Sequence, residues 1–189
     1  MGCLFWVIIA YLVGSLPFGL WIGLARGVDV RGQGSGNIGT TNVGRSLGKP
    51  WALLVLLLDA TKGYLPVMLA LHGACSPVWV ALTMVSAVLG HVFSLYLHFR
   101  GGKGVATALG VVGAVHWPAA LWGLGVYLVV LAVGRVSSLG SLFGVVAAML
   151  VLAFGDSLQA YSWAMLIITA LIFWRHKDNL RRLRRGEER

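Results

Sequence analysis

The stretch VATALGVVGAVHWPAALWGLGVYLVVLAVG, residues 105–134, runs for thirty residues without an Asp, Glu, Lys or Arg. One membrane crossing needs only about twenty apolar residues, so the stretch is too long for a single helix. Pro118 removes a backbone donor and disfavours helix at the residue before it, which places a break at His116 to Pro118. The stretch therefore predicts two short helices of about twelve and sixteen residues, roughly 18 and 24 Å long.

The composition of the whole chain predicts an integral membrane protein. Of 189 residues, 58% are hydrophobic and only 11% are charged, and the mean hydropathy of +0.84 is higher than a water-exposed surface allows. The formal net charge of +9 comes from short clusters of Lys and Arg between apolar runs. Membrane topology explains this pattern better than nucleic-acid binding does, so we expect the lipid bilayer as a partner and no nucleic acid.

The distribution of positive charge predicts the number of membrane spans. Six spans would place the cationic tail, residues 175–189, opposite Arg26 and Lys49, which the positive-inside tendency disfavours. Splitting residues 105–134 gives seven spans and brings all the cationic clusters to one side. We therefore expect an all-α integral membrane protein with seven transmembrane helices, an outside N-terminus and a cytoplasmic C-terminus, forming one domain over residues 1–189. The apolar runs are roughly Leu4 to Ala25, Trp51 to His72, Val78 to Leu97, Val105 to Gly134, Leu139 to Phe154 and Leu158 to Trp174.

A polar, glycine-rich segment follows the first run, which is itself expected to be a span rather than a signal peptide. The segment reads Gly34-Ser-Gly-Asn-Ile-Gly-Thr-Thr-Asn-Val-Gly-Arg45 and has no apolar periodicity, so we expect a loop that lines a site. Its Asn and Thr side chains can hydrogen-bond a hydroxyl group or hold the turns of the loop itself. A solvated connector between spans is the alternative.

The second such segment, Arg100-Gly-Gly-Lys-Gly-Val-Ala-Thr107, immediately precedes an apolar helix. Glycines let backbone N–H groups approach an anion, and the positive end of the helix dipole favours negative charge there. The segment therefore predicts a phosphate site that includes Lys103. The Walker A pattern is absent, so nucleotide hydrolysis is disfavoured. The alternative is a cationic membrane anchor whose glycines allow close helix packing.

Other polar residues stand out in or next to apolar runs. Asp59 and Lys62 are three residues apart in the second run, where an isolated charge is costly, so we expect them to pair. The pair either serves packing alone or also lines the site. His91 is expected to be a hydrogen-bonded interior histidine rather than a catalyst. His176 and Asn179 share a face if the last helix continues, and they either close the anion site or belong to a lipid-headgroup anchor.

The two cysteines, Cys3 and Cys75, have no His at metal-ligand spacing. Neither a zinc site nor a disulfide framework is expected, and both residues are predicted to be apolar fillers. We expect no metal and no cofactor.

Three segments together resemble the bacterial acyl-phosphate:glycerol-3-phosphate acyltransferases of the integral-membrane PlsY type. The similarity extends from the first span to the tail. This chain has Thr40 where the family pattern has Ala, Ser94 where a Pro is common and Arg100 where Lys is commoner. The matching segments are Ser35 to Arg45, Gly90-His-Val-Phe followed by Phe99 to Thr107, and His176-Lys-Asp-Asn179 with Arg182, Leu183, Gly186 and Glu187.

The resemblance implies the first acylation of phospholipid synthesis at the bacterial inner membrane. A fatty acyl group would pass from acyl phosphate to the 1-hydroxyl of sn-glycerol 3-phosphate, giving lysophosphatidic acid and phosphate at the cytoplasmic face. The soluble enzyme that makes acyl phosphate is a candidate partner. The expected catalytic residues are Ser35, Arg45, Lys103, His176 and Asn179. The expected substrate-binding residues are Gly36, Asn37, Thr40, Thr41, Asn42, Gly101, Gly102, Gly104 and Thr107.

The expected chemistry is an acyl transfer between two anionic substrates. Phosphate is a good leaving group, so the enzyme must mainly bring the substrates together and stabilise negative charge. Lys103 and the amides of Gly101, Gly102 and Gly104 are expected to hold a phosphate, and Arg45 to offset repulsion between the two phosphates. Either the substrate phosphate or His176 accepts the hydroxyl proton, and a covalent acyl-serine intermediate is disfavoured.

Two other functions are compatible with a membrane protein that binds anions. An acyltransferase that uses thioesters would carry His-x4-Asp, and none of the five histidines has an Asp five positions later. An anion transporter would show inverted repeats and polar groups on both faces, whereas the polar segments here are predicted on one face.

Overall fold

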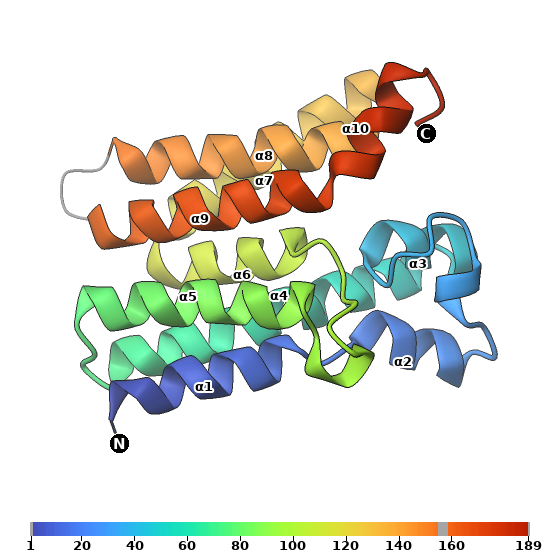
Figure 1. Ribbon diagram of the computed structural model, residues 1–189. Coiled ribbons are helices and arrows are strands. Elements are labelled where there is room, and N and C mark those ends of the chain that lie inside the picture. Colours follow the sequence, from blue (N-terminus) through green and yellow to red (C-terminus); the bar gives the residue numbers. More distant parts are fainter. Residues whose placement is uncertain (1, 155–158, 189) are drawn as a thin grey trace.

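A computed structural model describes residues 2–154 and 159–188, and within these ranges the regular structure is helical (Figure 1). The elements are α1 (Cys3–Gly14), α2 (Phe18–Ala25), the 3-10 turn η1 (Val30–Gly32), α3 (Thr40–Leu47), α4 (Lys49–His72), α5 (Pro77–Val92), the 3-10 turn η2 (Leu95–Leu97), α6 (Val105–Val115), α7 (Trp117–Gly134), α8 (Ser137–Ala153), α9 (Gln159–Arg175) and α10 (Lys177–Arg184).

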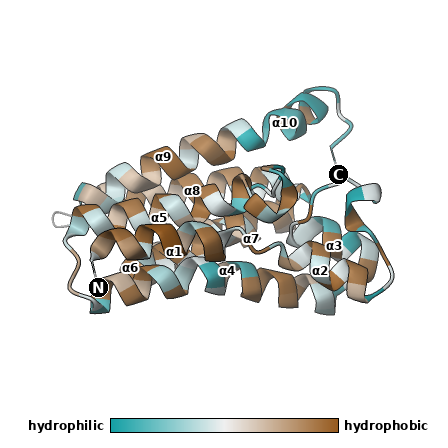
Figure 2. Cartoon of the chain, turned by 60° about the horizontal axis from the view of Figure 1, so that its bottom comes forward, coloured by the Kyte–Doolittle hydropathy of each residue, from teal (hydrophilic) through white to brown (hydrophobic). Residues whose placement is uncertain are grey.

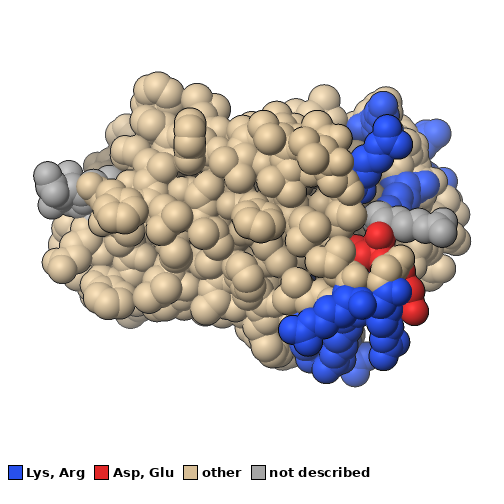
Figure 3. All heavy atoms as spheres, turned by 90° about the horizontal axis from the view of Figure 1, so that it is seen from above, with Lys and Arg blue, Asp and Glu red and all other residues tan. Residues whose placement is uncertain are grey.

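The long helices lie roughly along one axis, and the two ends of the molecule differ. The N-terminus and the α4–α5 turn lie at one end, whereas α2, α3 and α10 lie at the other (Figure 1). The helix surfaces are mainly hydrophobic, and α10 is hydrophilic (Figure 2). Lys and Arg side chains gather at the end that carries α10, with no such cluster along the rest of the visible face (Figure 3). We call this the cationic end.

The predicted break in residues 105–134 is confirmed. Helix α6 ends at Val115 and α7 begins at Trp117. His116 between them has φ −158°, and its Nδ1 accepts a hydrogen bond from the N–H of Ala119 at 3.1 Å, which caps α7. Pro118 occupies the first turn of α7, where its missing N–H is not needed.

The first apolar run is not one helix as expected, because it breaks between Gly14 and Phe18. Pro17 cannot donate a backbone hydrogen bond, and the carbonyls around it are bonded by side chains from elsewhere. The ammonium of Lys62 donates to the carbonyl of Leu16 at 2.7 Å, and the hydroxyl of Ser94 donates to that of Ser15. A buried polar contact therefore stabilises the break.

The predicted pairing of Asp59 and Lys62 is confirmed. Their charged groups lie 2.8 Å apart, and both side chains are almost completely buried in α4. Lys62 therefore has two structural roles. Its ammonium forms an ion pair with Asp59, and it donates a hydrogen bond to the carbonyl of Leu16 between α1 and α2.

The polar segment 34–45 is only partly a loop. We expected no helix there, but Thr40–Leu47 forms α3. Val43 of this short helix is fully buried and packs in a small apolar cluster with Leu20, Val30 and Val55. Tertiary burial of one apolar position therefore stabilises a helix that local sequence does not indicate.

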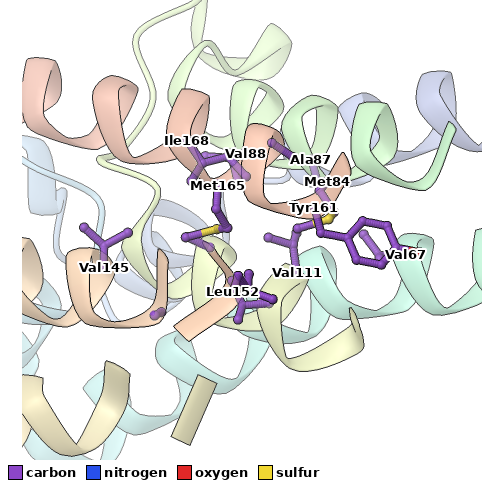
Figure 4. Close-up of a cluster of buried hydrophobic side chains, with 14 of the residues drawn as sticks. Val67, Met84, Ala87, Val88, Val111, Val145, Leu152, Tyr161, Met165 and Ile168 are labelled. Atoms are coloured by element: carbon purple, nitrogen blue, oxygen red, sulfur yellow. The ribbon is translucent and has the colours of Figure 1, made fainter. Parts of the chain in front are cut away.

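The main core lies between α1 and α4–α9. Figure 4 shows side chains from several helices meeting there, including Val67, Met84, Val111, Leu152 and Ile168. Many large apolar residues point outward instead, for example Val133, which is 84% exposed. Such an apolar exterior suits a lipid environment.

Helices α4 and α6 approach each other very closely. An added Cβ at Gly110 would lie 1.9 Å from the carbonyl oxygen of Ala60, and one at Gly63 would lie 2.4 Å from that of Thr107. Small residues permit this backbone contact, as is usual between membrane helices. The contact fixes α6, whose N-terminus begins at the cationic end.

Within the described residues, 2–154 and 159–188, four segments are long and apolar enough to cross a membrane. They are Cys3–Ala25, Lys49–His72, Pro77–Leu97 and Trp117–Gly134, and Val105–Val115 and Ser137–Ala153 are shorter apolar helices. The seven-span arrangement remains a prediction, and the expected start of the last span at residue 158 lies outside the described residues.

The prediction for the cysteines is wrong. Cys3 and Cys75 form a disulfide with Cα atoms 5.7 Å apart. The two residues are 72 positions apart in the sequence, and only the packing of α1 beside α4 and α5 brings them together. Two cysteines without a motif carry no pairing signal by themselves, which is why the sequence did not indicate it.

Candidate functional site

A cavity of about 190 Å³ lies where the cationic end meets the helices. Its polar wall comes from six parts of the chain that are distant in the sequence. The polar lining residues are Ser35, Asn37, Thr40, Thr41, Asn42, Arg45, Asp59, His91, Lys103, Ser137, Ser138, Ser141, His176, Asn179 and Glu188. The structure thus brings together all five residues predicted as catalytic.

Three helices begin at this cavity. Their N-cap residues are Gly39 for α3, Gly104 for α6 and Val136 for α8, and within the described chain none of these N-caps has a side-chain hydrogen bond. The N–H groups of a first helical turn have no partner within the helix, and the helix dipole is positive there. Their convergence favours an anion. The first-turn residues that line the cavity are Thr40, Thr41, Val105, Ala106, Ser137 and Ser138.

Cationic side chains add to this positive field. Lys103 and Arg45 both line the cavity. Burial lowers the pKa of Lys103, Glu188 opposes this shift, and Arg182, Arg45 and Arg175 add to it, which gives a pKa of about 8. A substrate anion beside Lys103 would relieve the repulsion among these cations.

The first polar segment is held by its own asparagines. Asn42 is buried, its Oδ1 accepts from the N–H of Ser35 at 2.9 Å, and its Nδ2 donates to the carbonyls of Val30 and Gln33. Asn37 accepts from the N–H of Gly39 at 2.8 Å. The amide of Asn42 is therefore occupied by the loop, which supports the turn-holding role rather than substrate binding.

Other predicted binding residues have mixed positions. Thr41 lines the cavity and its hydroxyl lies 3.0 Å from that of Ser137. Thr40 also lines it, and its buried hydroxyl has no hydrogen-bond partner within the described chain. Gly36 has φ +69° and shapes the turn before α3. Thr107 is fully buried and its backbone packs on Gly63 of α4, so it contributes to helix packing and is not among the lining residues.

The glycine-rich loop differs from the expected phosphate cradle. The N–H of Gly101 donates to the carbonyl of Val92 at 3.0 Å, and the N–H of Gly102 donates to that of His91 at 3.1 Å. These two amides are therefore not available to a phosphate as we expected. Gly104 does line the cavity, and its φ of +90° turns the chain into α6.

His176 and Asn179 enter the site from the junction of α9 and α10. The helix does not continue through His176 as the shared-face argument assumed, but both side chains are buried and line the cavity. His176 Nδ1 lies 2.8 Å from the carbonyl of Ile172, which can only accept, so Nδ1 carries the proton and Nε2 accepts. Burial and the nearby Lys103 lower the pKa of His176 to about 4. The ring is therefore neutral at neutral pH.

Glu188 is a site residue that sequence reasoning missed. Its Oε1 accepts from the hydroxyl of Ser138 and the amide of Asn179, and its Oε2 accepts from Arg182 Nε at 2.7 Å. Burial raises the pKa of Glu188, but these hydrogen bonds outweigh it and the net pKa is lowered. The resemblance pointed to the exposed Glu187 instead. The available sequence signal was Gly186, a glycine that takes φ +68° where the chain turns before Glu188.

The serines of α8 were also missed. Ser137, Ser138 and Ser141 all line the cavity, and Tyr127 OH lies 3.2 Å from the hydroxyl of Ser137. Their sequence signal was the pattern Ser137-Ser-Leu-Gly-Ser141 at the start of an apolar run just after Arg135.

Asp59 and His91 form the buried polar floor of the cavity. His91 Nδ1 lies 3.8 Å from Asp59 Oδ1, and both side chains are nearly inaccessible to solvent. The ring of His91 also lies directly under the glycine-rich loop, since an added Cβ at Gly102 would be 2.1 Å from His91 Nε2. The expectation of an interior His91 is confirmed, although no hydrogen bond to its Nδ1 is present within the described chain.

Apolar side chains from four helices also line the cavity, and we call this part of its lining the apolar arm. Leu109 and Val112 of α6, Leu124 of α7, Val145 of α8 and Met165 of α9 line this arm. Val145 and Met165 project from their helices in Figure 4. The joined polar and apolar parts suit a ligand with an anionic head and a hydrocarbon chain. No group of three or more His, Cys, Asp or Glu able to hold a metal occurs within residues 2–154 and 159–188.

Fold and site together define a multi-pass membrane protein with a cavity at its cationic end that is lined by cationic and apolar side chains. A family model for glycerol-3-phosphate acyltransferase matches residues 4–186. The chain belongs to the glycerol-3-phosphate acyltransferase family.

Relatives and solved structures extend this similarity over nearly the whole chain. Glycerol-3-phosphate acyltransferase of Anaeromyxobacter sp. (strain K) is 49% identical over 95% of this chain and 92% of its own length. That of Aquifex aeolicus (strain VF5) is 43% identical over 100% and 98%. The crystal structure of PlsY (YgiH), an integral membrane glycerol 3-phosphate acyltransferase, in its glycerol 3-phosphate form, matches with a TM-score of 0.96 and 41% identity, covering 99% of this chain and 94% of that one. The lysophosphatidic acid form matches with a TM-score of 0.94.

Proposed function

We propose that the protein transfers a fatty acyl group from acyl phosphate to the 1-hydroxyl of sn-glycerol 3-phosphate. The hydroxyl oxygen attacks the acyl carbonyl carbon, the bond from that carbon to the phosphate oxygen breaks, and lysophosphatidic acid and inorganic phosphate are released. The observation that supports this most is the meeting of three helix N-termini, Lys103 and Arg45 at a cavity whose lining also includes the apolar arm. Two phosphorylated substrates need the polar part, and the acyl chain needs the arm.

The roles of individual residues follow from charge and geometry. Lys103 and the first turn of α6 hold one phosphate, and Arg45 with the first turn of α3 offsets repulsion between the two. Ser35, Asn179 and the Nε2 of His176 orient glycerol 3-phosphate by hydrogen bonds. Stabilisation of developing negative charge by such fixed donors is commonly the largest catalytic contribution.

The substrate phosphate accepts the hydroxyl proton in this proposal. His176 has a pKa of about 4, whereas a phosphate monoester has a second pKa of about 6 and is therefore the stronger base by roughly a hundredfold. His176 then serves as a neutral acceptor that fixes the direction of the hydroxyl group. A covalent Ser35 intermediate is not required, because phosphate leaves readily.

The proposed setting is the bacterial inner membrane, with seven spans, the N-terminus outside and the cavity at the cytoplasmic face. The cationic end fits the cytoplasmic side by the positive-inside tendency. The Cys3–Cys75 disulfide belongs to the opposite end, which fits an oxidising compartment. A soluble enzyme that makes acyl phosphate would deliver its product at the cationic end.

The test is an assay of the purified protein with palmitoyl phosphate and glycerol 3-phosphate. We expect equal amounts of lysophosphatidic acid and phosphate, and no product when palmitoyl-CoA replaces palmitoyl phosphate. Product from palmitoyl-CoA alone would instead favour the thioester enzyme. Phosphate uptake into proteoliposomes without an acyl substrate would favour the transporter.

A further inference from the structure

Arg175, the last residue of α9, donates hydrogen bonds to the glycine-rich loop that contains Gly101 and Gly102. Its Nη2 donates to the carbonyl of Gly101 at 2.9 Å and its Nε donates to that of Gly102 at 3.2 Å. Its guanidinium carbon also lies 5.6 Å from the centre of the Trp174 ring. Two bonds from one planar guanidinium fix direction as well as distance.

The other side of the same loop rests on the end of α5. The N–H groups of Gly101 and Gly102 donate to the carbonyls of Val92 and His91. All four backbone polar groups of the two glycines are thus bonded, two to α5 and two to Arg175. The spacing is tight, since a side chain at Gly101 would begin 2.0 Å from the carbonyl oxygen of His91.

We call these contacts of Gly101 and Gly102 with α5 and Arg175 the clamp. The clamp restrains the backbone next to Lys103, the following residue in the chain. A Lys side chain has four rotatable bonds, so its ammonium reaches a fixed place only if its backbone is fixed. The two glycines have no side chains to restrain the loop and are intrinsically flexible. The restraint therefore comes from the helices on either side.

We infer that Arg175 is a positioning residue that holds the backbone of Gly101 and Gly102 against α5 and thereby directs Lys103 to the substrate phosphate. This inference rests on the role proposed for Lys103. It gives Arg175 a part in turnover beyond the membrane anchoring expected of the cationic tail.

Three variants test the inference. Arg175→Gln removes the guanidinium that makes both hydrogen bonds. Arg175→Lys keeps the positive charge and can replace one of the two hydrogen bonds. Arg184→Gln is the matched control, because Arg184 is an exposed cation of the same tail. Amide hydrogen exchange is measured by mass spectrometry on substrate-free protein over residues 98–107. Steady-state kinetics then use palmitoyl phosphate and glycerol 3-phosphate.

We expect exchange at the Gly101 and Gly102 amides to accelerate at least tenfold in Arg175→Gln and less in Arg175→Lys. We expect kcat/KM to fall at least tenfold in Arg175→Gln, with partial rescue by Lys, while the midpoint of thermal unfolding stays within a few degrees. Exchange and kinetics equal to those of Arg184→Gln would overturn the inference.

Two further comparisons make the test independent of whether Arg175→Gln folds and of the proposed reaction. If Arg175→Gln does not fold, slow exchange of Gly101 and Gly102 in the wild type, together with faster exchange in Arg175→Lys, supports the clamp, and fast exchange in the wild type refutes it. If the wild type makes no product from palmitoyl phosphate, the proposed function fails, whereas the exchange measurement still judges the clamp.

Discussion

Cys3, the first residue of α1, is joined by a disulfide to Cys75 in the turn between α4 and α5. The bond closes a segment with a sequence separation of 72 that contains α1 to α4. The start of α1 and the α4–α5 turn lie at the end of the molecule opposite α3 and α10 (Figure 1), and α3 and α10 supply lining residues of the cavity. Stability and catalysis should therefore respond differently to loss of the disulfide.

We predict that Cys3→Ser/Cys75→Ser lowers the midpoint of thermal unfolding but leaves kcat within about twofold. Closing a loop of this length stabilises a soluble protein by about 4 kcal/mol at most, and less when the unfolded chain stays in the membrane. Thiol titration of denatured wild-type protein with a maleimide should find no free thiol before reduction and two after it. Two reactive thiols before reduction would contradict the disulfide.

Glu188 and Glu187 form a natural pair of test and control. Glu188→Gln removes the charge that accepts hydrogen bonds from Asn179, Arg182 and Ser138. We expect kcat/KM for glycerol 3-phosphate to fall at least tenfold, because hydrogen bonds to a charged group are worth about 1.5–3 kcal/mol each. Glu187→Gln, at an exposed position, should stay within twofold. Equal effects of the two substitutions would count against a specific role for Glu188.

The low pKa of Lys103 predicts a pH dependence. Below about 8 its ammonium is charged and attracts phosphate, and above about 8 it becomes neutral, so kcat/KM should fall as pH rises through this value. Bound phosphate stabilises the ammonium, so the decline in kcat should occur at higher pH. Lys103→Arg, if it turns over, should lack this decline because a guanidinium stays charged. Identical alkaline profiles for the two proteins would assign the decline to another group.

The apolar arm predicts that chain-length preference can be changed without touching the polar wall. Leu124→Trp on α7 adds bulk inside the arm. We expect the ratio of kcat/KM for palmitoyl phosphate to that for lauroyl phosphate to fall about tenfold. Leu121→Trp is the control, because Leu121 lies on the same helix but is 57% exposed on its outer surface. An unchanged ratio in Leu124→Trp would place the acyl chain elsewhere.

The sequence predicted the features that depend on local chemistry. Pro118 dictates the break between α6 and α7, and the cost of buried charge dictates the pairing of Asp59 with Lys62. The catalytic candidates Ser35, Arg45 and Lys103 stood out because polar residues are rare in this chain. All of them line the cavity.

The features that sequence reasoning missed depend on long-range packing. Glu188 reaches the site only because the chain turns at Gly186, and Cys3 meets Cys75 only because α1 packs beside α5. The amides of Gly101 and Gly102 were expected to bind phosphate, but they donate hydrogen bonds to carbonyls at the end of α5 instead. None of these contacts is visible from spacing along the chain.

The measurement that tests the proposed function most directly compares wild type with Lys103→Ala in one assay. Purified protein is given palmitoyl phosphate and glycerol 3-phosphate, and lysophosphatidic acid and phosphate are both quantified. We expect one phosphate per lysophosphatidic acid from the wild type, and a loss of at least a thousandfold in Lys103→Ala with an unchanged thermal unfolding midpoint. Near-normal turnover by Lys103→Ala, or phosphate release without lysophosphatidic acid, would contradict the proposal.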